Sequence, residues 1–186
     1  YAEEAQVPRI CFINKLDRTG ASFERSYQSI LNRLSKKAVR MQIPIGEEEK
    51  HEGVIDLLKM KAYYFEGEMG NKVVESEIPE DLLESAQKYR NELVERIVEN
   101  DEDLMTAYLE GKEIALDVLK ETMRKAVIEN KIFPVLTGSA LKNKGVQLVL
   151  DAVVDFLPSP LDIPPVKGTD PNTGELVGAY CDGTFK

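Results

Sequence analysis

The chain has 186 residues, 42% of them hydrophobic, a formal net charge of −9 and a mean hydropathy of −0.30. No apolar run approaches the roughly 18 residues of a transmembrane helix, so we expect no helix that spans a membrane. Two cysteines, Cys11 and Cys181, favour neither a disulfide framework nor a metal site, and a reducing intracellular compartment fits them best.

The negative charge is concentrated in the middle of the chain. Residues 66–121 hold 17 acidic against 6 basic residues. Because nucleic acids attract positive charge, we expect no direct nucleic-acid site there. Two interpretations of the acidic segment remain open, a solvated helical face and a docking surface for a basic partner.

The first element is a predicted strand that runs directly into polar side chains. The apolar run Ile10–Ile13 is followed by Asn14, Lys15 and Asp17. A helix capped by Ser22 should come next, because apolar residues recur at helical spacing at Phe23, Tyr27, Ile30, Leu31 and Leu34. The first unit is therefore strand, polar turn and helix.

The chain starts at Tyr1, without an initiator Met or a basic targeting segment. We therefore expect it to begin partway through a longer protein.

The middle of the chain has a different pattern. Short β-rich runs at residues 39–45, 54–57, 62–65 and 73–74 predict a meander with a hairpin turn near Gly67 and Gly70. A helical run opened by Pro79 then carries an apolar stripe at Leu82, Leu83, Ala86, Tyr89, Leu93, Val94 and Ile97. Two further helices are indicated by Leu104, Tyr108 and Leu109, and by Ile114, Val118, Leu119, Met123 and Val127. This α+β layout predicts an insertion over residues 40–130.

The strand, turn and helix pattern returns near the end. A strand at residues 132–137 leads into Gly138-Ser-Ala-Leu141, and a helix follows over residues 146–156. Strands that alternate with helices predict an α/β fold with a parallel sheet, whose ligands bind at the carboxyl ends of the strands. We therefore assign residues 1–39 and 131–158 to this domain. Residues 159–186, punctuated by Pro160, Pro164, Pro165 and Pro171, are predicted to be a linker into a following module.

The two strand exits suggest recognition of guanine. The carboxylate of Asp17 can accept two hydrogen bonds, from the ring N–H and the exocyclic amine, whereas adenine would present a lone pair. Lys15 can lay its aliphatic stem over the ring, and Asn14 can hold the turn and reach the base edge. Ser139 and Ala140 can brace the second loop and give a backbone N–H to the base carbonyl, and Leu141 can cover the other ring face. Taken alone, Asn14–Asp17 could equally be a polar turn that ends a strand.

Longer stretches resemble a known family. "FINKLDRTG" resembles the guanine-specificity motif of translational GTPases, and "TGSALKNKGVQLVLDAV" resembles the last guanine-contacting loop and final helix of their G domain. "QIPIGEEEKHEGVIDLLKMKAYYF", "DLMTAYLEG" and "LPSPLDIPP" closely resemble the elongation factor G family. The resemblance covers essentially the whole chain. It implies the C-terminal part of a P-loop-type G domain, with residues 40–130 as its G′ insertion and residues 159–186 leading into a β-barrel domain.

The resemblance also implies a function. The intact protein would be a ribosome-dependent GTPase that drives translocation of transfer and messenger RNA, with GTP or GDP as ligand. Its specificity residues would be Asn14, Lys15, Asp17, Ser139, Ala140 and Leu141. The sequence contains no G-x-x-x-x-G-K-[ST] phosphate loop and no switch segments that hold Mg²⁺. We therefore expect no catalytic residue and no metal ligand in this chain, and no hydrolysis by the chain alone.

The resemblance suggests partners and a compartment as well. The ribosomal stalk protein would dock on the acidic insertion, through the outward carboxylates Glu84, Glu92, Glu95 and Glu99. The bacterial cytoplasm is the expected compartment, with the mitochondrial matrix as the alternative. Two alternative functions remain, a related ribosomal GTPase (a ribosomal protection protein or the release-factor GTPase) and a non-catalytic interaction module.

The remaining candidate residues carry weaker signals. We expect the only histidine of the sequence, His51, to lie on a surface loop. The acidic clusters Glu47–Glu49 and Asp101–Asp103 lack the spacing of a calcium-binding loop.

Overall fold

A three-stranded parallel sheet forms one part of the fold. The computed structural model describes residues 2–162, 166–169 and 176–179. The parallel sheet has the order β1 (Cys11–Ile13), β7 (Phe133–Thr137) and β2 (Ala38–Arg40). All five residues of the central strand β7 are buried, as expected for a parallel strand with both faces covered. The register pairs Ile13 with Thr137, so β1 and β7 end level with each other.

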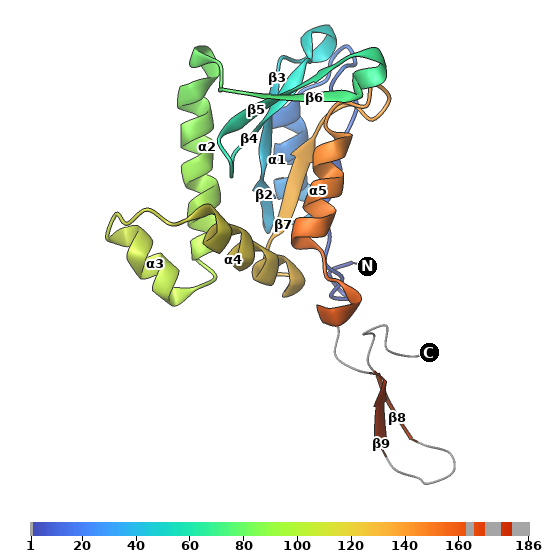
Figure 1. Ribbon diagram of the computed structural model, residues 1–186, viewed down its shortest axis with the longest axis vertical. Helices are drawn as coiled ribbons and strands as arrows, with labels where there is room; N and C mark the ends of the chain where they lie inside the picture. The colour runs from blue at the N-terminus through green and yellow to red at the C-terminus, as the bar shows by residue number, and fades with distance from the viewer. Residues whose placement is uncertain (1, 163–165, 170–175, 180–186) are drawn as a thin grey trace.

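A second sheet is antiparallel and lies between β2 and α2 in the chain. Its order is β3 (Gln42–Ile45), β4 (Gly53–Asp56), β5 (Lys61–Glu66) and β6 (Lys72–Ser76). Figure 1 shows this sheet near the top of the molecule, at the end where β7 finishes. The α/β fold class with an inserted antiparallel sheet is confirmed, whereas the domain limits at residues 40, 130 and 158 stay predictions.

The run of residues 39–45, predicted as one strand, is divided between the two sheets. Met41 stands at the division: its N–H donates to the carbonyl of Val135 (3.0 Å), and its own carbonyl accepts the N–H of Leu57 (3.0 Å). The apolar pattern continues through this point because both sides are buried. Periodicity alone therefore could not show that the chain passes here from a parallel sheet to an antiparallel one.

Five α-helices surround the sheets in the described part of the chain. They are α1 (Phe23–Arg33), α2 (Glu80–Val98), α3 (Glu102–Leu109), α4 (Leu116–Ile128) and α5 (Val146–Phe156). The predicted cap of α1 is confirmed, since Ser22 Oγ accepts the N–H of Arg25 (3.4 Å). Helix α1 packs on β1 and β2, and α4 packs on β7, α5 and α2 (Figure 1). Four residues predicted to lie in the apolar pattern of a helix are instead exposed, namely Leu34, Leu83, Leu109 and Val118.

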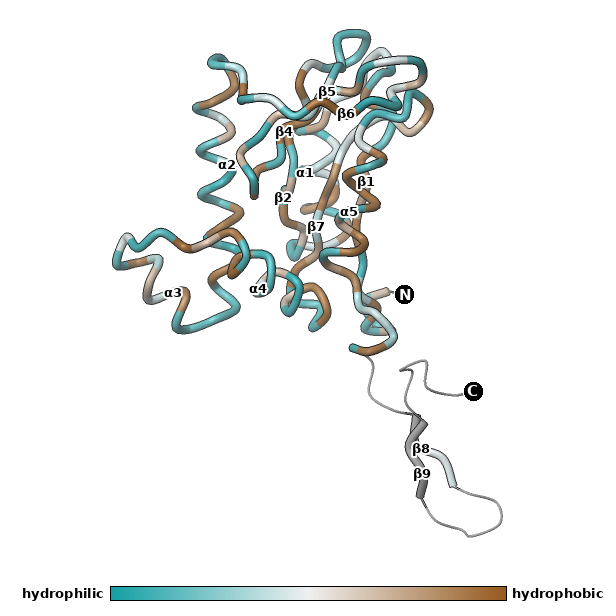
Figure 2. The backbone as a smooth tube through the Cα atoms, viewed as in Figure 1, coloured by the Kyte–Doolittle hydropathy of each residue, from teal (hydrophilic) through white to brown (hydrophobic). Residues whose placement is uncertain are grey.

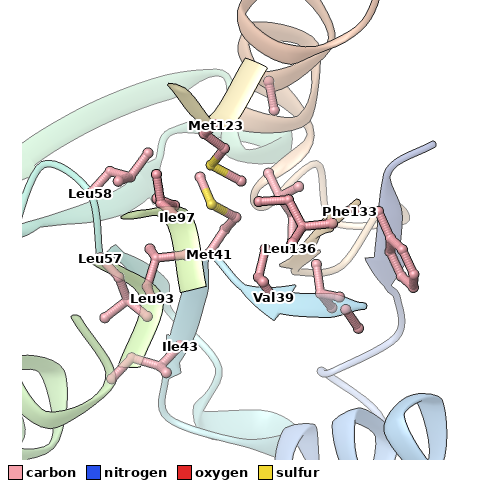
Figure 3. Packing of buried hydrophobic residues seen from close by; sticks show 14 of the residues in the cluster. Val39, Met41, Ile43, Leu57, Leu58, Leu93, Ile97, Met123, Phe133 and Leu136 are labelled. Atoms are coloured by element: carbon pink, nitrogen blue, oxygen red, sulfur yellow. The ribbon is translucent and has the colours of Figure 1, made fainter. Parts of the chain in front are cut away.

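One hydrophobic core joins the two sheets. It contains residues of the parallel sheet, the antiparallel sheet, α2 and α4 in a single cluster, including Val39, Met41, Ile43, Ile55, Leu57, Leu93, Ile97, Met123 and Leu136. Figure 3 shows the side chains of Met41, Ile97 and Met123 pointing toward one another. Figure 2 shows hydrophobic segments along β2 and β7, whereas α2 alternates between hydrophilic and hydrophobic positions. The antiparallel sheet is therefore packed closely against the parallel one.

The end of the described chain contains a short antiparallel pair, β8 (Val166–Thr169) and β9 (Leu176–Ala179). The predicted linker residues Pro164, Pro165 and Pro171 lie outside the described residues. Among the helices of the described ranges, none combines the length and the apolar character needed to cross a membrane.

Candidate functional site

The carboxyl ends of β1 and β7 bring two loops together, residues 14–20 and 138–145. Backbone hydrogen bonds continue past the ends of the strands: the N–H of Gly138 donates to the carbonyl of Ile13 (3.1 Å), and the N–H of Leu16 donates to the carbonyl of Gly138 (3.2 Å). All six residues predicted to read guanine lie on these two loops. The structure therefore places them at the edge of the sheet where an α/β fold binds its ligands.

Asn14 connects the two loops through its side chain. Its Oδ1 accepts the backbone N–H of Lys15 (2.7 Å) and that of Ala140 (2.9 Å). The predicted bracing of the loops thus comes from an amide on the first loop and a backbone N–H on the second. The predicted contact of Ala140 with a base carbonyl stays a prediction.

Lys15 has a left-handed backbone with φ of +66°. A non-glycine residue with positive φ is uncommon, and such residues concentrate at binding sites where the surroundings hold them in place. Here the Asn14 side chain accepts the Lys15 N–H directly, which supports the unusual geometry. The side chain of Lys15 is exposed, as is needed to meet a ligand ring.

Asp17 is the chemically distinctive residue of the site. It is only 9% exposed, and within the described part of the chain its Oδ1 has no hydrogen-bond partner. The Lys142 ammonium lies 3.9 Å from the other oxygen, Oδ2. Interaction with the Ser139 hydroxyl lowers the pKa of Asp17 below its ordinary value, although burial acts in the opposite direction. The site therefore holds an ionised carboxylate with one buried oxygen ready to accept a donor.

The second loop is held in a tight turn. Ser139 is fully buried, and its backbone exchanges two hydrogen bonds with Lys144, each 2.9 Å long. Gly145 has φ of +87°, and a Cβ at this position would lie 2.6 Å from the carbonyl of Thr137, so the turn requires glycine. Leu141 projects from this turn and is 66% exposed. An exposed leucine on the second loop is available to cover the face of a flat ligand.

The four glutamates predicted to bind a partner lie elsewhere, on α2 and at its C-terminal end. Glu84, Glu92, Glu95 and Glu99 are all exposed, and Glu99 pairs with Arg96 (3.0 Å). Glu92, Glu95 and Glu99 also line a surface hollow of about 380 Å³ between α1 and α2. The structure thus presents an acidic helical face separate from the two loops.

The expectation for His51 was wrong. The residue is 2% exposed, its Nδ1 lies 3.4 Å from the Gly46 carbonyl, and its Nε2 has no hydrogen-bond partner among the described residues. Burial lowers the pKa of His51, so the imidazole is neutral at pH 7. A histidine among charged neighbours looks exposed in sequence, and only the packing of the loop between β3 and β4 shows otherwise.

Sequence reasoning also missed the contribution of two lysines. Lys142 faces the Asp17 carboxylate, and Lys144 donates from Nζ to the carbonyl of His51 (2.6 Å). Both lie on the second loop, directly after Leu141, in the turn "KNKG". The sequence does not show which groups their side chains meet, because Asp17 and His51 are distant along the chain.

The acidic clusters have structural contacts of their own. Asp101 caps α3 by accepting the N–H of Leu104 (3.1 Å), and the carboxylates of Glu47 and Glu48 accept backbone N–H groups near the start of α1. Across the described ranges, no group of three or more His, Cys, Asp or Glu side chains is arranged to hold a metal ion.

Comparisons with known proteins relate this chain to one domain family, one curated protein and one solved structure. Residues 1–159 match the family described as "Elongation factor Tu GTP binding domain". The chain is 50% identical over 185 residues to elongation factor G of Mycoplasma genitalium, covering 99% of this chain and 27% of that protein. A crystal structure of a protein from Thermus thermophilus superposes with a TM-score of 0.76 at 31% identity, covering 95% of this chain and 27% of that one. The chain thus spans about a quarter of the length of each relative.

Proposed function

This chain belongs to the elongation factor Tu GTP-binding domain family, and we propose that it is the guanine-recognition part of a longer ribosome-dependent GTPase of the elongation factor G kind. The likeness to elongation factor G of Mycoplasma genitalium supports this proposal over almost the whole chain. The intact protein would use GTP hydrolysis to drive translocation of transfer and messenger RNA, in the cytoplasm of a bacterial cell. The mitochondrial matrix is the alternative compartment.

One observation carries the nucleotide assignment. The Oδ1 atom of Asp17 is buried without a hydrogen-bond donor among the described residues, at the point where the two loops meet. A buried acceptor left unpaired is costly, and the N–H groups of guanine would satisfy it. In this arrangement Asn14, Ser139 and Ala140 hold the loops, while Lys15 and Leu141 lie exposed on either loop to cover the ring faces.

Hydrolysis requires residues beyond this chain. The sequence has no G-x-x-x-x-G-K-[ST] loop to cradle the phosphates, and the described residues offer no cluster suited to Mg²⁺. Mg²⁺ would neutralise charge on the phosphates in the intact protein, held by residues outside this chain. This chain's own part is to select the base and orient it.

The acidic face of α2 supports a second part of the proposal. Glu84, Glu92, Glu95 and Glu99 are exposed along one long helix and its C-terminal end, and complementary charge accelerates encounters between proteins. We assign this face to docking of the ribosomal stalk protein, whose terminal domain would present basic residues to it.

The experiment that tests the proposed function uses the intact protein with purified ribosomes. We expect GTP hydrolysis that depends on ribosomes, competition by GDP but not by ADP, and movement of peptidyl-tRNA on a programmed ribosome. Ribosome-dependent hydrolysis with no tRNA movement would instead indicate a ribosomal protection protein or the release-factor GTPase. Absence of both nucleotide binding and hydrolysis would reduce the chain to an interaction module.

A further inference from the structure

The loop between β3 and β4, residues 46–52, holds the loop that carries Asp17. The backbone N–H of Glu48 donates to the carbonyl of Leu16 (2.9 Å). The side chain of the same residue accepts the N–H of Gly20 at Oε1 (2.7 Å). Leu16 and Gly20 stand on either side of Asp17 in the chain, so Glu48 fixes the Asp17 loop at two points that bracket the carboxylate.

The same loop also contacts the helix that follows. Oε1 of Glu47 accepts the backbone N–H of Phe23, the first residue of α1, at 3.1 Å. The first N–H groups of a helix have no partner within the helix, so an acceptor from another segment stabilises the start of α1. The segment from Leu16 to Phe23 is therefore held along its length by two neighbouring glutamates of the loop between β3 and β4.

The loop after β7 is joined to the antiparallel sheet as well. Lys144 donates from Nζ to the carbonyl of His51 (2.6 Å), and Gln147 donates from Nε2 to the carbonyl of Gly70 (3.1 Å). Gly70 lies in the connection between β5 and β6, and a Cβ there would come within 2.8 Å of the carbonyl of Lys142. Both loops of the candidate site are thus joined to connections between strands of the same antiparallel sheet.

The backbone around Glu48 is adapted to these contacts. Glu48 has φ of +56°, a left-handed value that is uncommon for a residue with a side chain. Two residues earlier, Gly46 has φ of +73°, and a Cβ there would lie 2.0 Å from the carbonyl of Lys50. Left-handed residues persist where several contacts hold them, and for Glu48 these contacts are Leu16 and Gly20.

We propose that Glu48 is a positioning residue for guanine recognition. It holds the loop of residues 14–20 so that the Asp17 carboxylate faces both the ring N–H and the exocyclic amine of the base. The inference rests on the proposed function and extends it, because it makes the inserted antiparallel sheet part of the apparatus that sets base specificity. Glu48 does not touch the nucleotide; it acts through Leu16 and Gly20.

The test compares GDP with inosine diphosphate, which lacks the exocyclic amine. In the intact protein, the ratio of the two dissociation constants (inosine diphosphate over GDP) measures recognition of that amine. We expect Glu48→Ala to lower the ratio about three- to tenfold, the effect of losing a typical hydrogen bond. Glu48→Gln keeps an acceptor oxygen and should restore most of the ratio. Glu49→Ala is the matched control, since Glu49 is exposed in the same turn and its side chain makes no hydrogen bond or ion pair with the described residues.

The ratio separates positioning from a general loss of folding, because partial unfolding weakens binding of both nucleotides in proportion. An unchanged ratio in Glu48→Ala would overturn the inference, as would equal losses in Glu48→Ala and Glu48→Gln, or in Glu48→Ala and Glu49→Ala. Should Glu48→Ala fail to fold, Glu48→Asp, one methylene shorter, takes its place with the same expected fall. If the unaltered protein binds no GDP, the proposed function fails first and the inference falls with it.

Discussion

The Oδ1 atom of Asn14 lies 2.9 Å from the backbone nitrogen of Ala140, across 126 positions of the sequence. Both residues are exposed, so water can replace the contact in the unfolded or altered protein. This hydrogen bond therefore contributes little to the free energy of unfolding, and its main effect is to fix the position of one loop relative to the other.

The first prediction follows from this contact. Asn14→Ala in the intact protein removes one acceptor shared by two N–H groups and should weaken GDP binding about tenfold, which corresponds to about 1.4 kcal/mol. The free energy of unfolding should fall by about 1 kcal/mol or less, because the groups left behind are solvated. Calorimetric titration with GDP checks the affinity, and Asn32→Ala, an exposed asparagine on α1, is the control. Equal affinity in the Asn14 variant and the control would remove Asn14 from the site.

The second prediction concerns base selectivity. In Asp17→Asn, the amide can donate to the 2-carbonyl of xanthine, whereas it would meet the exocyclic amine of guanine as donor against donor. We expect the affinity for GDP to fall about 10²-fold or more and xanthosine diphosphate to become the preferred ligand. Competition binding with the two diphosphates measures the change. A retained preference for GDP would show that Asp17 does not read the base.

The third prediction concerns the chain by itself. Residues 1–186 should not hydrolyse GTP and should bind it more weakly than micromolar, because the phosphate-binding loop is absent from the sequence. A calorimetric titration, with the intact protein under the same conditions as reference, gives the comparison. Submicromolar affinity would reveal a phosphate-binding element that the sequence motifs do not identify.

The fourth prediction tests the acidic face of α2. Reversal of two exposed carboxylates, Glu92→Lys with Glu95→Lys, should slow ribosome-stimulated GTP turnover about three- to tenfold at low salt, and less at high salt, because screening weakens steering by charge. Nucleotide affinity should stay unchanged. Glu99 is left intact since it pairs with Arg96.

The control for the acidic face reverses the same amount of charge elsewhere, at the exposed residues Glu68 and Glu113. Turnover is measured against ribosome concentration at two salt levels for both double variants. If the two double variants behave alike, net charge and not the α2 face governs the encounter, and the face is a solvated surface.

The fifth prediction is a pH dependence of stability caused by His51. Burial lowers the pKa of His51 in the folded protein below its ordinary value of 6.5. As the pH falls below 6.5, the unfolded chain takes up a proton that the folded chain does not, so this contribution to stability is present above pH 6.5 and declines below it. The slope for one proton is at most about 1.4 kcal/mol per pH unit.

The His51→Gln variant isolates this contribution. Its stability should decline less than that of the unaltered chain between about pH 7.5 and about pH 5, even if its absolute stability is lower at both. Urea unfolding at the two pH values gives the four free energies required. Parallel declines in the two proteins would show that His51 takes up its proton equally well in the folded state.

The local units of this protein could be predicted from its amino-acid sequence. The apolar runs that became β1 and β7, and the helical spacing that became α1 and α5, depend on neighbours a few residues away, so periodicity was enough to predict them. The order of strand, polar turn and helix, repeated twice, also indicated that Asp17 and Ser139 would meet at the carboxyl edge of one parallel sheet.

Which segments lie against one another could be seen only once the chain was folded. The division of residues 39–45 between two sheets at Met41, the burial of His51 and the contact of Glu48 with Gly20 all depend on segments distant in sequence. Glu47, Glu48 and His51 have a charged, solvent-like sequence context, and no local pattern separates a glutamate that faces water from one that accepts a backbone N–H. Burial and long-range hydrogen bonds are properties of the packed chain, which is why the contacts of Glu47, Glu48 and His51 with the loops of the candidate site emerged only from the fold.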